Sequence, residues 1–352
     1  MKHLIRAVAG MLALTVAMEA GAQTCTGDVV QDGRVDGADL GTLLAYWGPR
    51  SSQPFSIASD LDGDGNIDGA DLGILLANWG ACPGPAWATV IEAQPDPAVV
   101  TDANLRAAIQ ATGLPWRVRD KGTGIEMLLI PPGTFQMGCI MGSVLYECQD
   151  LELPVHQVTL TNAFYLGRFE VTQAEWVAKM GTNPSSFQGE PDSSSRPVDS
   201  VSWNTIQVFL SATGFRLPTE AEWEYACRAG TQTPFHSGPG FPNGTSDDNS
   251  VSQIAWVNCN DGCNTKPVGR KAANSFGIYD ILGNVLEWVN DWYGPYTPTE
   301  QVNPGGPVYG SYRVVRGGAW NYITAYARSS DRSGGVPGNA DGKFGFRVAR
   351  NP

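Results

Sequence analysis

A short acidic segment occurs twice near the N-terminus, and this duplication restricts the fold more than any other feature of the chain. Residues 28–47 reappear 32 residues later as residues 60–79, and Val-Asp-Gly-Ala-Asp-Leu-Gly in the first copy matches Ile-Asp-Gly-Ala-Asp-Leu-Gly in the second. Apolar residues follow each acidic stretch at helical spacing, as Leu40, Leu43, Leu44 and Trp47 do in the first copy. The sequence therefore predicts two loop–helix units whose apolar stripes pack against each other.

Each copy also places oxygen-bearing side chains at alternate positions of a loop of about twelve residues. In the second copy these residues are Asp60, Asp62, Asp64, Asp68 and Asp71, with Asn66 offering its main-chain carbonyl and Gly65 at the turn. In the first copy Asp28, Asp32, Asp36 and Asp39 hold their places, but Val30 stands where an oxygen ligand is expected. Calcium takes about six to eight hard oxygen ligands, so the spacing predicts a calcium site in the second loop and a weaker one in the first.

The repeat resembles a type I dockerin, because it has duplicated loops, Asp at each twelfth position and one helix after each loop. Dockerins bind cohesin domains and tether extracellular enzymes, so the resemblance implies a cohesin-bearing partner. The two loop positions where dockerins tend to choose their cohesin are Gly37-Ala38 and Gly69-Ala70, which carry no polar side chain. The alternative interpretation is a calcium-stabilised structural module without a cohesin.

The N-terminus has the pattern of a secretory signal. Lys2 and Arg6 precede an apolar run at residues 7–18, and small residues follow at 20–22, so residues 1–22 are expected to be removed and the protein exported. The run is too short to span a membrane, which needs about 20 residues. Loss of Lys2, Arg6 and Glu19 changes the formal charge from −12 to −13, which disfavours nucleic acid and anionic membranes as partners.

The remaining chain divides into three expected parts. Residues 25–82 form the repeat module, residues 83–124 form a Pro- and Ala-rich linker with a short helix at 101–112, and residues 125–352 form a large domain. With 42 Gly and 24 Pro in the chain, the large domain is expected to be rich in loops. Its regular elements are predicted as strands at 127–130, 135–137 and 158–160, and as helices starting at Thr172, Ser202 and Thr219 and ending at Gly181, Gly214 and Gly230.

Four motifs of the large domain occur in the order of a known family. They are residues 215–225 (FRLPTEAEWEY), 283–288 (GNVLEW), 316–320 (RGGAW) and 345–348 (GFRV). Over residues 127–350 the chain resembles the formylglycine-generating enzyme, or sulfatase-modifying factor, family, which implies an α+β, C-type-lectin-like fold. The family's calcium motif falls on residues 280–287 and implies ligands from Asp280, Gly283, Val285 and Glu287. The alternative is a Gly-Asn turn that enters a strand with Glu287 exposed.

Family oxidases convert a sulfatase cysteine to formylglycine with oxygen and Cu(I), which two cysteine thiolates hold. Here the corresponding positions are Ala319, Trp320 and Tyr322, and no cysteine follows Cys263. Because Cu(I) prefers soft sulfur ligands, we expect no copper and no oxidase activity. The large domain is then a binding or scaffolding domain for a glycan or peptide, with its contact surface expected at Trp288, Arg316, Trp320, Asn321 and Tyr322. The alternative function is a formylglycine-generating oxidase with an atypical site.

The chain contains 7 cysteines, so at least one has no partner within it. The expected disulfides are Cys25–Cys82, which would close the repeat module, and the short-range pairs Cys139–Cys148 and Cys259–Cys263. Cys259 and Cys263 are also candidate thiolate ligands, but a disulfide is favoured in an oxidising compartment. Cys227 is left over and expected to be buried. The resemblance implies a family disulfide from Cys227 to the segment near Ser329, and its second cysteine is absent.

Overall fold

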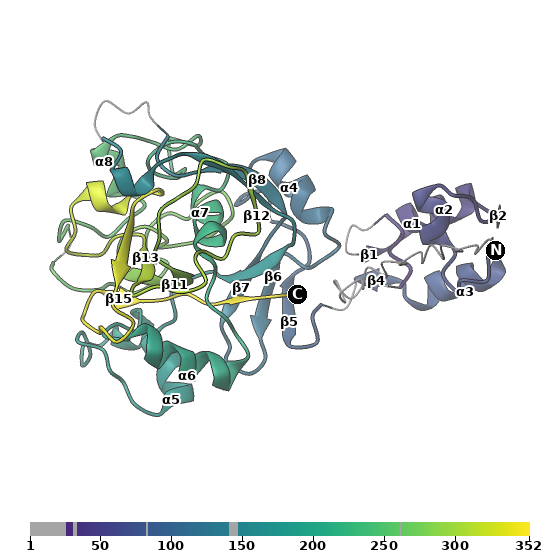
Figure 1. Cartoon of the computed structure of the whole chain (residues 1–352). Coiled ribbons are helices and arrows are strands. Elements are labelled where there is room, and N and C mark those ends of the chain that lie inside the picture. Colours follow the sequence, from purple (N-terminus) through teal and green to yellow (C-terminus); the bar gives the residue numbers. More distant parts are fainter. Residues whose placement is uncertain (1–25, 31–33, 82–83, 141–146, 261) are drawn as a thin grey trace, which may run out of the picture.

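The computed structural model describes residues 26–30, 34–81, 84–140, 147–260 and 262–352. The chain forms two hydrophobic cores, a small one in the repeat module and a large one that begins at Ala88. Figure 1 shows both parts, the module in purple and blue and the large domain from blue through green to yellow. The expected signal at 1–22 and the Cys25–Cys82 pair lie outside the described residues. None of the described helices is long and apolar enough to cross a bilayer.

The repeat module is built from two equivalent halves. Its helices are α1 (Gly37–Ala45), α2 (Pro54–Ser59) and α3 (Gly69–Ala77), and its short strands are β1 (Arg34–Val35), β2 (Gly48–Pro49), β3 (Asn66–Ile67) and β4 (Gly80–Ala81). β1 pairs with β4 and β2 pairs with β3, both antiparallel. A shift of 32 residues places β1 on β3 and β2 on β4, so the two strand pairs are equivalent. The predicted pair of loop–helix units is confirmed.

The apolar stripes of the two helices are only partly buried. Val35, Leu43, Ile67 and Leu75 are completely buried between the halves, and Leu40 and Leu72 pack partly against them. By contrast Leu44, Trp47, Leu76 and Trp79 each keep about half of their surface exposed. The prediction that the whole stripe packs inward is therefore wrong for four positions, which remain available on the surface.

The first sheet of the large domain contains residues that the sequence assigned to a linker. Its order is β16–β10–β7–β6–β5, with β5 (Ala88–Glu92), β6 (Arg117–Asp120), β7 (Glu126–Ile130), β10 (Phe164–Gly167) and β16 (Ala349–Arg350). Helix α4 (Ala103–Gln110) confirms the predicted short helix, with Asp102 as its N-cap. The linker prediction is wrong for residues 88–92 and 117–120, because β5 and β6 pair with each other and β6 pairs with β7.

Two further sheets complete the domain. A four-stranded sheet has the order β14–β13–β11–β15, from β11 (Leu286–Trp292), β13 (Arg313–Arg316), β14 (Arg332–Gly335) and β15 (Phe344–Gly345). A three-stranded sheet has the order β12–β9–β8, from β8 (Gly133–Met137), β9 (His156–Leu160) and β12 (Gln301–Val302). The predicted strands at 127–130, 135–137 and 158–160 thus correspond to β7, β8 and β9.

Three of the four helices that follow α4 begin at the capping residues that the sequence indicates, and α8 was not predicted. The four helices are α5 (Gln173–Met180), α6 (Trp203–Thr213), α7 (Glu220–Arg228) and α8 (Asp248–Val251), with short 3-10 turns η1 (Asp150–Glu152), η2 (Ser193–Ser195) and η3 (Thr324–Ala327). Thr172, Ser202 and Thr219 are the N-caps of α5, α6 and α7, each with a side-chain hydrogen bond. α7 ends one residue before the predicted Gly230, at a left-handed Ala229. The domain is α+β and rich in loops, as expected.

Candidate functional site

The acidic side chains of the second loop converge in the folded module. Ligand oxygens of Asp60, Asp62 and Asp71 all lie within 4.8 Å of one another, and Asp60 and Asp71 are buried. Asp71 accepts hydrogen bonds from the main-chain N–H groups of Leu61 and Asp68 at 2.6 and 2.8 Å. Asp60 Oδ1 is buried with no hydrogen-bond partner among the described residues. An orphaned buried carboxylate oxygen beside two other carboxylates fits a hard cation such as calcium.

The remaining predicted ligands of this loop are exposed and hold its turns. Asp62 accepts from the N–H of Asp64, and Asp64 accepts from the N–H of Asn66. Asp68 is the N-cap of α3 and accepts from Ala70 N–H. Gly65 has φ +93°, a conformation that L side chains rarely adopt, so a glycine is required at this turn.

The first loop repeats part of this arrangement. Asp39 is buried and accepts from the N–H groups of Val30 and Asp36 at 3.0 and 2.9 Å, as Asp71 does from its loop. Asp36 caps α1, and Asp28 is half-buried. Asp32 lies outside the described residues. In the described part of this loop, no three carboxylates lie close together. Calcium binding in the first loop stays a prediction.

The segment at residues 280–287 forms a buried charge cluster. Glu287 is buried on β11, where both of its oxygens accept from the guanidinium of Arg347 at 2.6–2.9 Å and Oε2 also accepts from Trp223 Nε1. Asp280 accepts from Gly269 N–H through Oδ2, and its Oδ1 is buried without a partner in the described part of the chain. Burial raises the pKa of Asp280 to about 6. Glu287 is thus buried and ion-paired, so the exposed-glutamate alternative is wrong.

Some of the predicted calcium ligands of this segment are already engaged within the protein, and calcium binding there stays a prediction. Of the two side chains, only Asp280 keeps an open oxygen, because Arg347 neutralises Glu287. The main-chain N–H groups of Gly283 and Val285 donate to Gly317 O and to Glu170, whereas the predicted ligands are the carbonyl oxygens of these two residues. Calcium would have to displace a buried Arg347–Glu287 pair, whose separation is costly. The guanidinium of Arg347 thus already places positive charge beside Glu287.

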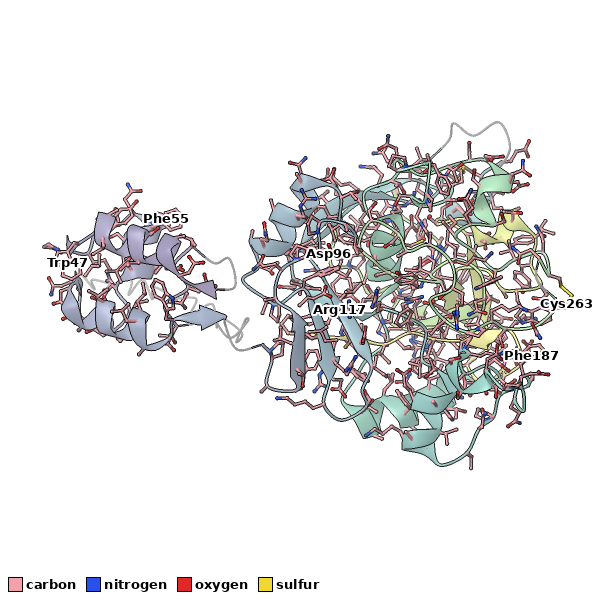
Figure 2. All side chains as sticks on the ribbon, turned by 180° about the vertical axis from the view of Figure 1, so that it is seen from behind. Trp47, Phe55, Asp96, Arg117, Phe187 and Cys263 are labelled. Atoms are coloured by element: carbon pink, nitrogen blue, oxygen red, sulfur yellow. A yellow bond between two sulfur atoms is a disulfide. The ribbon has the colours of Figure 1, made fainter. Side chains whose placement is uncertain are left out.

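The five predicted ligand-contact residues fall into two groups. Trp288 and Arg316 are completely buried, so the prediction that they contact a ligand is wrong. Trp320 and Tyr322 are partly exposed and Asn321 is exposed. Together with the exposed Ile323 and Tyr326 they form a surface that we call the aromatic patch, residues 320–323 and 326. Tyr322 and Tyr326 lie edge to face at 5.8 Å, and Phe187, labelled in Figure 2, lies edge to face against Trp320 at 5.3 Å.

The aromatic patch includes the positions where the resemblance to the family's oxidases implies a reactive cysteine. Ala319 is buried, and Tyr322 places a phenol where the first thiol would stand. Main-chain hydrogen bonds from Asn258 to Tyr322 and from Cys259 to Trp320, both 2.8 Å, hold the Cys259 segment against the patch. Cys259 is joined to Cys263, and Cys139 to Cys148, so both short-range disulfides are present as predicted. The sulfur that borders the patch is therefore oxidised and offers no thiolate.

A buried arginine–carboxylate network holds the loop that follows the patch. Arg316 donates to Glu224 and to the carbonyls of Ser329, Ser330 and Asp331. Glu224 also accepts from Arg228, and both side chains are buried. Burial raises the pKa of Glu224, but Arg228 and Arg316 outweigh it and hold that pKa below its ordinary value. One ionised carboxylate thus fixes two buried cations.

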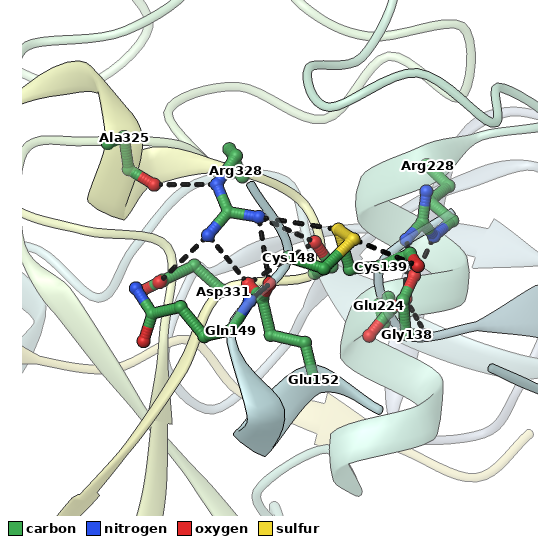
Figure 3. Close-up of a disulfide and its surroundings, with 11 residues drawn as sticks. Gly138, Cys139, Cys148, Gln149, Glu152, Glu224, Arg228, Ala325, Arg328 and Asp331 are labelled. Atoms are coloured by element: carbon green, nitrogen blue, oxygen red, sulfur yellow. Dashed lines mark hydrogen bonds and ion pairs between the residues drawn. A yellow bond between two sulfur atoms is a disulfide. The ribbon is translucent and has the colours of Figure 1, made fainter. Parts of the chain in front are cut away.

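The same loop is clamped on its other side. Figure 3 shows Arg328 reaching Glu152 beside the Cys139–Cys148 disulfide, and the Arg328 and Glu152 side chains are 2.9 Å apart. Arg332 binds both oxygens of Glu220 at 2.7 and 2.8 Å. These pairs were missed from the sequence, because their partners are more than 100 residues apart along the chain. The local signal for the network is the Glu224–Arg228 spacing on α7, which places both on one helix face.

Cys227 is a free, fully buried thiol, as predicted, and it faces the position of the missing family disulfide. Its Sγ lies 3.5 Å from Ser329 Oγ. Burial raises the pKa of the Cys227 thiol to about 12, so it is neither a nucleophile nor a metal ligand at neutral pH.

Replacing Ser329 by Cys is expected to form a disulfide with Cys227. The bond would close a loop of about 100 residues, for which we expect a gain of about 2–4 kcal/mol in the free energy of unfolding. Mass spectrometry after alkylation in denaturant checks the bond, and chemical unfolding checks the gain. Ser330→Cys is the matched control, because Ser330 contacts Glu152 instead and should leave Cys227 open to alkylation. Alkylation of Cys227 in the Ser329→Cys variant would contradict the geometry.

Two buried aspartates should make the stability of the large domain depend on pH. Burial, with Glu220 nearby, raises the pKa of Asp291 to about 8, and burial beside Glu152 raises that of Asp331 to about 7. Unfolded aspartate titrates near 3.9, so up to pH 8 the folded state binds more protons, and the free energy of unfolding falls as pH rises. Buried His236, with a pKa of about 4, acts in the opposite sense only below about pH 6.5.

The thermal midpoint of the large domain is therefore expected to fall between pH 6.5 and 8, and Asp291→Asn is expected to reduce that slope. Differential scanning calorimetry at several pH values measures both. A midpoint that rises with pH, or a slope that Asp291→Asn leaves unchanged, would count against the buried, protonated state of Asp291.

Comparison with known proteins matches the repeat module and the large domain to two different families. The family model described as the sulfatase-modifying factor enzyme 1-like domain matches residues 111–352, and that of the dockerin type I domain matches residues 26–78. The formylglycine-generating enzyme of Mus musculus is 30% identical over 287 residues, which cover 64% of this chain and 74% of the enzyme. Treponema denticola variable protein 1 superposes with a TM-score of 0.56 at 30% identity, over 65% of this chain and 95% of that one.

A serine/threonine-protein kinase of Chlamydia pneumoniae, pkn1, is 31% identical over 252 residues, but this chain spans only 38% of the kinase's length. The match to residues 111–352 and the superposition confirm the expected C-type-lectin-like, α+β fold of the large domain. The chain belongs to the sulfatase-modifying factor enzyme 1-like family, and it carries a type I dockerin module ahead of that domain.

Proposed function

We propose that this is an exported binding protein, in which a calcium-loaded dockerin module tethers a large domain that has no oxidase activity. One observation carries the proposal. The surface that corresponds to the oxidase site presents Trp320, Tyr322 and Tyr326, and the bordering Cys259 is held in a disulfide. Oxygen and carbon cannot replace thiolates as ligands for Cu(I), whereas exposed aromatic rings suit contact with a glycan or a peptide.

The second loop supplies the calcium site of the module. Its ligands would be the side chains of Asp60, Asp62, Asp64, Asp68 and Asp71 with the carbonyl of Asn66. The ion would neutralise carboxylates that otherwise repel each other, and so hold β3 and the start of α3 in place. No other ion is needed for this role.

The partner-binding face of the module is apolar. Leu44, Trp47, Leu76 and Trp79 each keep about half of their surface exposed, and Gly37-Ala38 and Gly69-Ala70 leave the helix starts without polar side chains. Exposed tryptophan and leucine of this kind mark a protein-binding surface. A cohesin-bearing partner would therefore present a matching apolar face. The formal charge of −12 argues against nucleic acid or an anionic membrane in its place.

An oxidase with an atypical site is the second candidate, and the 30% identity to the mouse formylglycine-generating enzyme favours it. The two are separated by incubating the purified chain with Cu(I), oxygen and a peptide that carries the sulfatase motif. We expect no aldehyde above background and no stoichiometric cuprous ion on the protein. An active formylglycine-generating enzyme serves as the positive control. Aldehyde formation that Tyr322→Phe or a patch variant abolishes would overturn the proposal in favour of the oxidase.

A further inference from the structure

The large domain has a cavity that shares no residue with the aromatic patch. It has a volume of about 410 Å³ and lies among the ends of β8, β9 and β11, the start of α7 and the loop at 294–307. The charged and titratable side chains that line it are His156, Glu220, Asp291, Tyr296 and Arg332. Its remaining wall is largely apolar, with Met137, Trp292, Pro304 and Pro307.

One carboxylate of this cavity is already neutralised. Glu220 accepts hydrogen bonds from Nε and Nη2 of Arg332, and it accepts another from the hydroxyl of Tyr296 at 3.0 Å. Arg332 also donates to the carbonyls of Leu151 and Gly294, so four of its five N–H donors are engaged by described residues. Glu220 and Arg332 therefore form a closed pair.

The second carboxylate has no such partner among the described residues. Asp291 is 3% exposed, and its Oδ2 accepts from the N–H of Glu220 at 2.8 Å, while Oδ1 accepts no hydrogen bond from them. Gly306 leaves open the space beside this oxygen, since a Cβ there would lie 3.0 Å from Asp291 Oδ1. His156 donates from Nδ1 to the carbonyl of Pro154, which leaves Nε2 as its acceptor. The cavity thus holds one more carboxylate than cation.

We propose that this cavity binds a primary ammonium group on an alkyl stem, as a lysine side chain carries. The compact ammonium suits the site better than a guanidinium, because a planar fork needs two open carboxylate oxygens and Asp291 offers one. The methylene stem would lie along Met137, Trp292 and the prolines, as lysine stems do on apolar surfaces. Val308 and Tyr309 follow directly at the rim and are 92% and 85% exposed, so they are free to contact the rest of a peptide.

The protonation of Asp291 is consistent with this assignment. Burial raises its pKa to about 8, so the carboxyl gives up its charge when no cation is present. A bound ammonium would hold it ionised. The assignment requires neither calcium nor the tether, so it goes beyond the proposed function and stands or falls separately.

The test is calorimetric titration of the full chain with Nα-acetyl-lysine-N-methylamide. Nα-acetyl-norleucine-N-methylamide, which has the stem without the charge, and butylammonium, which is a free amine, are the comparison probes. We expect the lysine probe to bind, the norleucine probe to bind at least tenfold more weakly, and Asp291→Asn to weaken the lysine probe at least tenfold. Stronger binding of butylammonium than of the lysine probe would overturn the assignment to a lysine side chain in favour of free amines.

The controls separate binding from folding. The side-chain amide introduced by Asp291→Asn can still accept from Glu220 N–H, and Thr297→Trp fills the cavity from its exposed wall, so two independent variants should abolish binding. Glu190→Gln removes an exposed charge elsewhere and should leave affinity unchanged. Absence of binding by every probe, equal binding of the norleucine probe, or unchanged binding by Asp291→Asn would each overturn the proposal.

Discussion

Removal of calcium is expected to abolish the cooperative unfolding transition of the dockerin module. Ligand oxygens of Asp60, Asp62 and Asp71 lie within 4.8 Å of one another, and Arg50 is paired to Asp60 from a partly exposed position. Without the ion, the buried carboxylates repel each other, and the small core around Leu43 and Leu75 cannot offset that cost. Chelation should therefore remove the helical signal of α1 and α3 and leave the large domain folded.

Asp60→Asn combined with Asp71→Asn is expected to weaken calcium binding by at least 100-fold, which corresponds to about 2.7 kcal/mol. Calorimetric titration with calcium measures the affinity, and circular dichroism with and without chelator measures the fold. Glu300→Gln removes an exposed acidic charge of the large domain, and this control should bind calcium normally. A helical signal that chelator leaves unchanged would reject the second loop as a calcium site, and with it the proposed tether.

Glu224→Gln is expected to destabilise the large domain by about 3–5 kcal/mol, because it removes the carboxylate between the buried Arg228 and Arg316 and leaves Arg316 only Glu220, at 3.8 Å. For a domain of this size the thermal midpoint should fall by about 10 °C. The matched control is Glu222→Gln on the same helix. Glu222 pairs with Arg216, which is one-third exposed, so its loss should cost about 1 kcal/mol or less.

A double variant separates the effect of the unpaired charge on stability from the effect of packing. In the double variant Glu224→Gln with Arg316→Met, one of the two stranded cations is gone, so part of the lost stability should return. Hydrogen exchange at residues 328–332 should increase in Glu224→Gln, because Arg316 loses the carboxylate that it binds directly while it donates to the carbonyls of that loop. Equal midpoints for the Glu222 and Glu224 variants would show that the buried network does not stabilise the loop.

Buried arginine–carboxylate pairs hold the loops of the large domain. The sequence suggested that metal ions fix a loop-rich domain, and it placed calcium at residues 280–287. The structure shows buried ion pairs that hold the loops, namely Arg347 on Glu287, Arg332 on Glu220 and Arg328 on Glu152, while calcium at residues 280–287 stays a prediction. Each pair joins segments that are far apart in the sequence, so together they take the place of distant disulfides. Only short-range disulfides occur among the described cysteines.

Local features were predictable because their causes are local. Thr172, Ser202 and Thr219 satisfy the first N–H groups of their own helices, and Glu175 and Glu222 complete two of the capping boxes. The repeat determined the two equivalent loops, since each needs only its own twelve residues to place its carboxylates. The alternating strands at residues 133–137 and 156–160 carry their pattern in the same way.

The errors came from long-range contacts. Residues 88–92 have the composition of a linker, yet they become β5 because the edge of β6 offers main-chain partners. Trp288 and Arg316 belong to family motifs that suggest a ligand surface, yet they lie on opposite faces of the four-stranded sheet and both are buried. The sequence by itself determined the family, the calcium-loop geometry, the helix ends and the absence of thiols beyond Cys263. Which residues face solvent, and which carboxylates meet arginines rather than ions, only the tertiary structure decided, because burial and charge pairing depend on segments that approach one another only after folding.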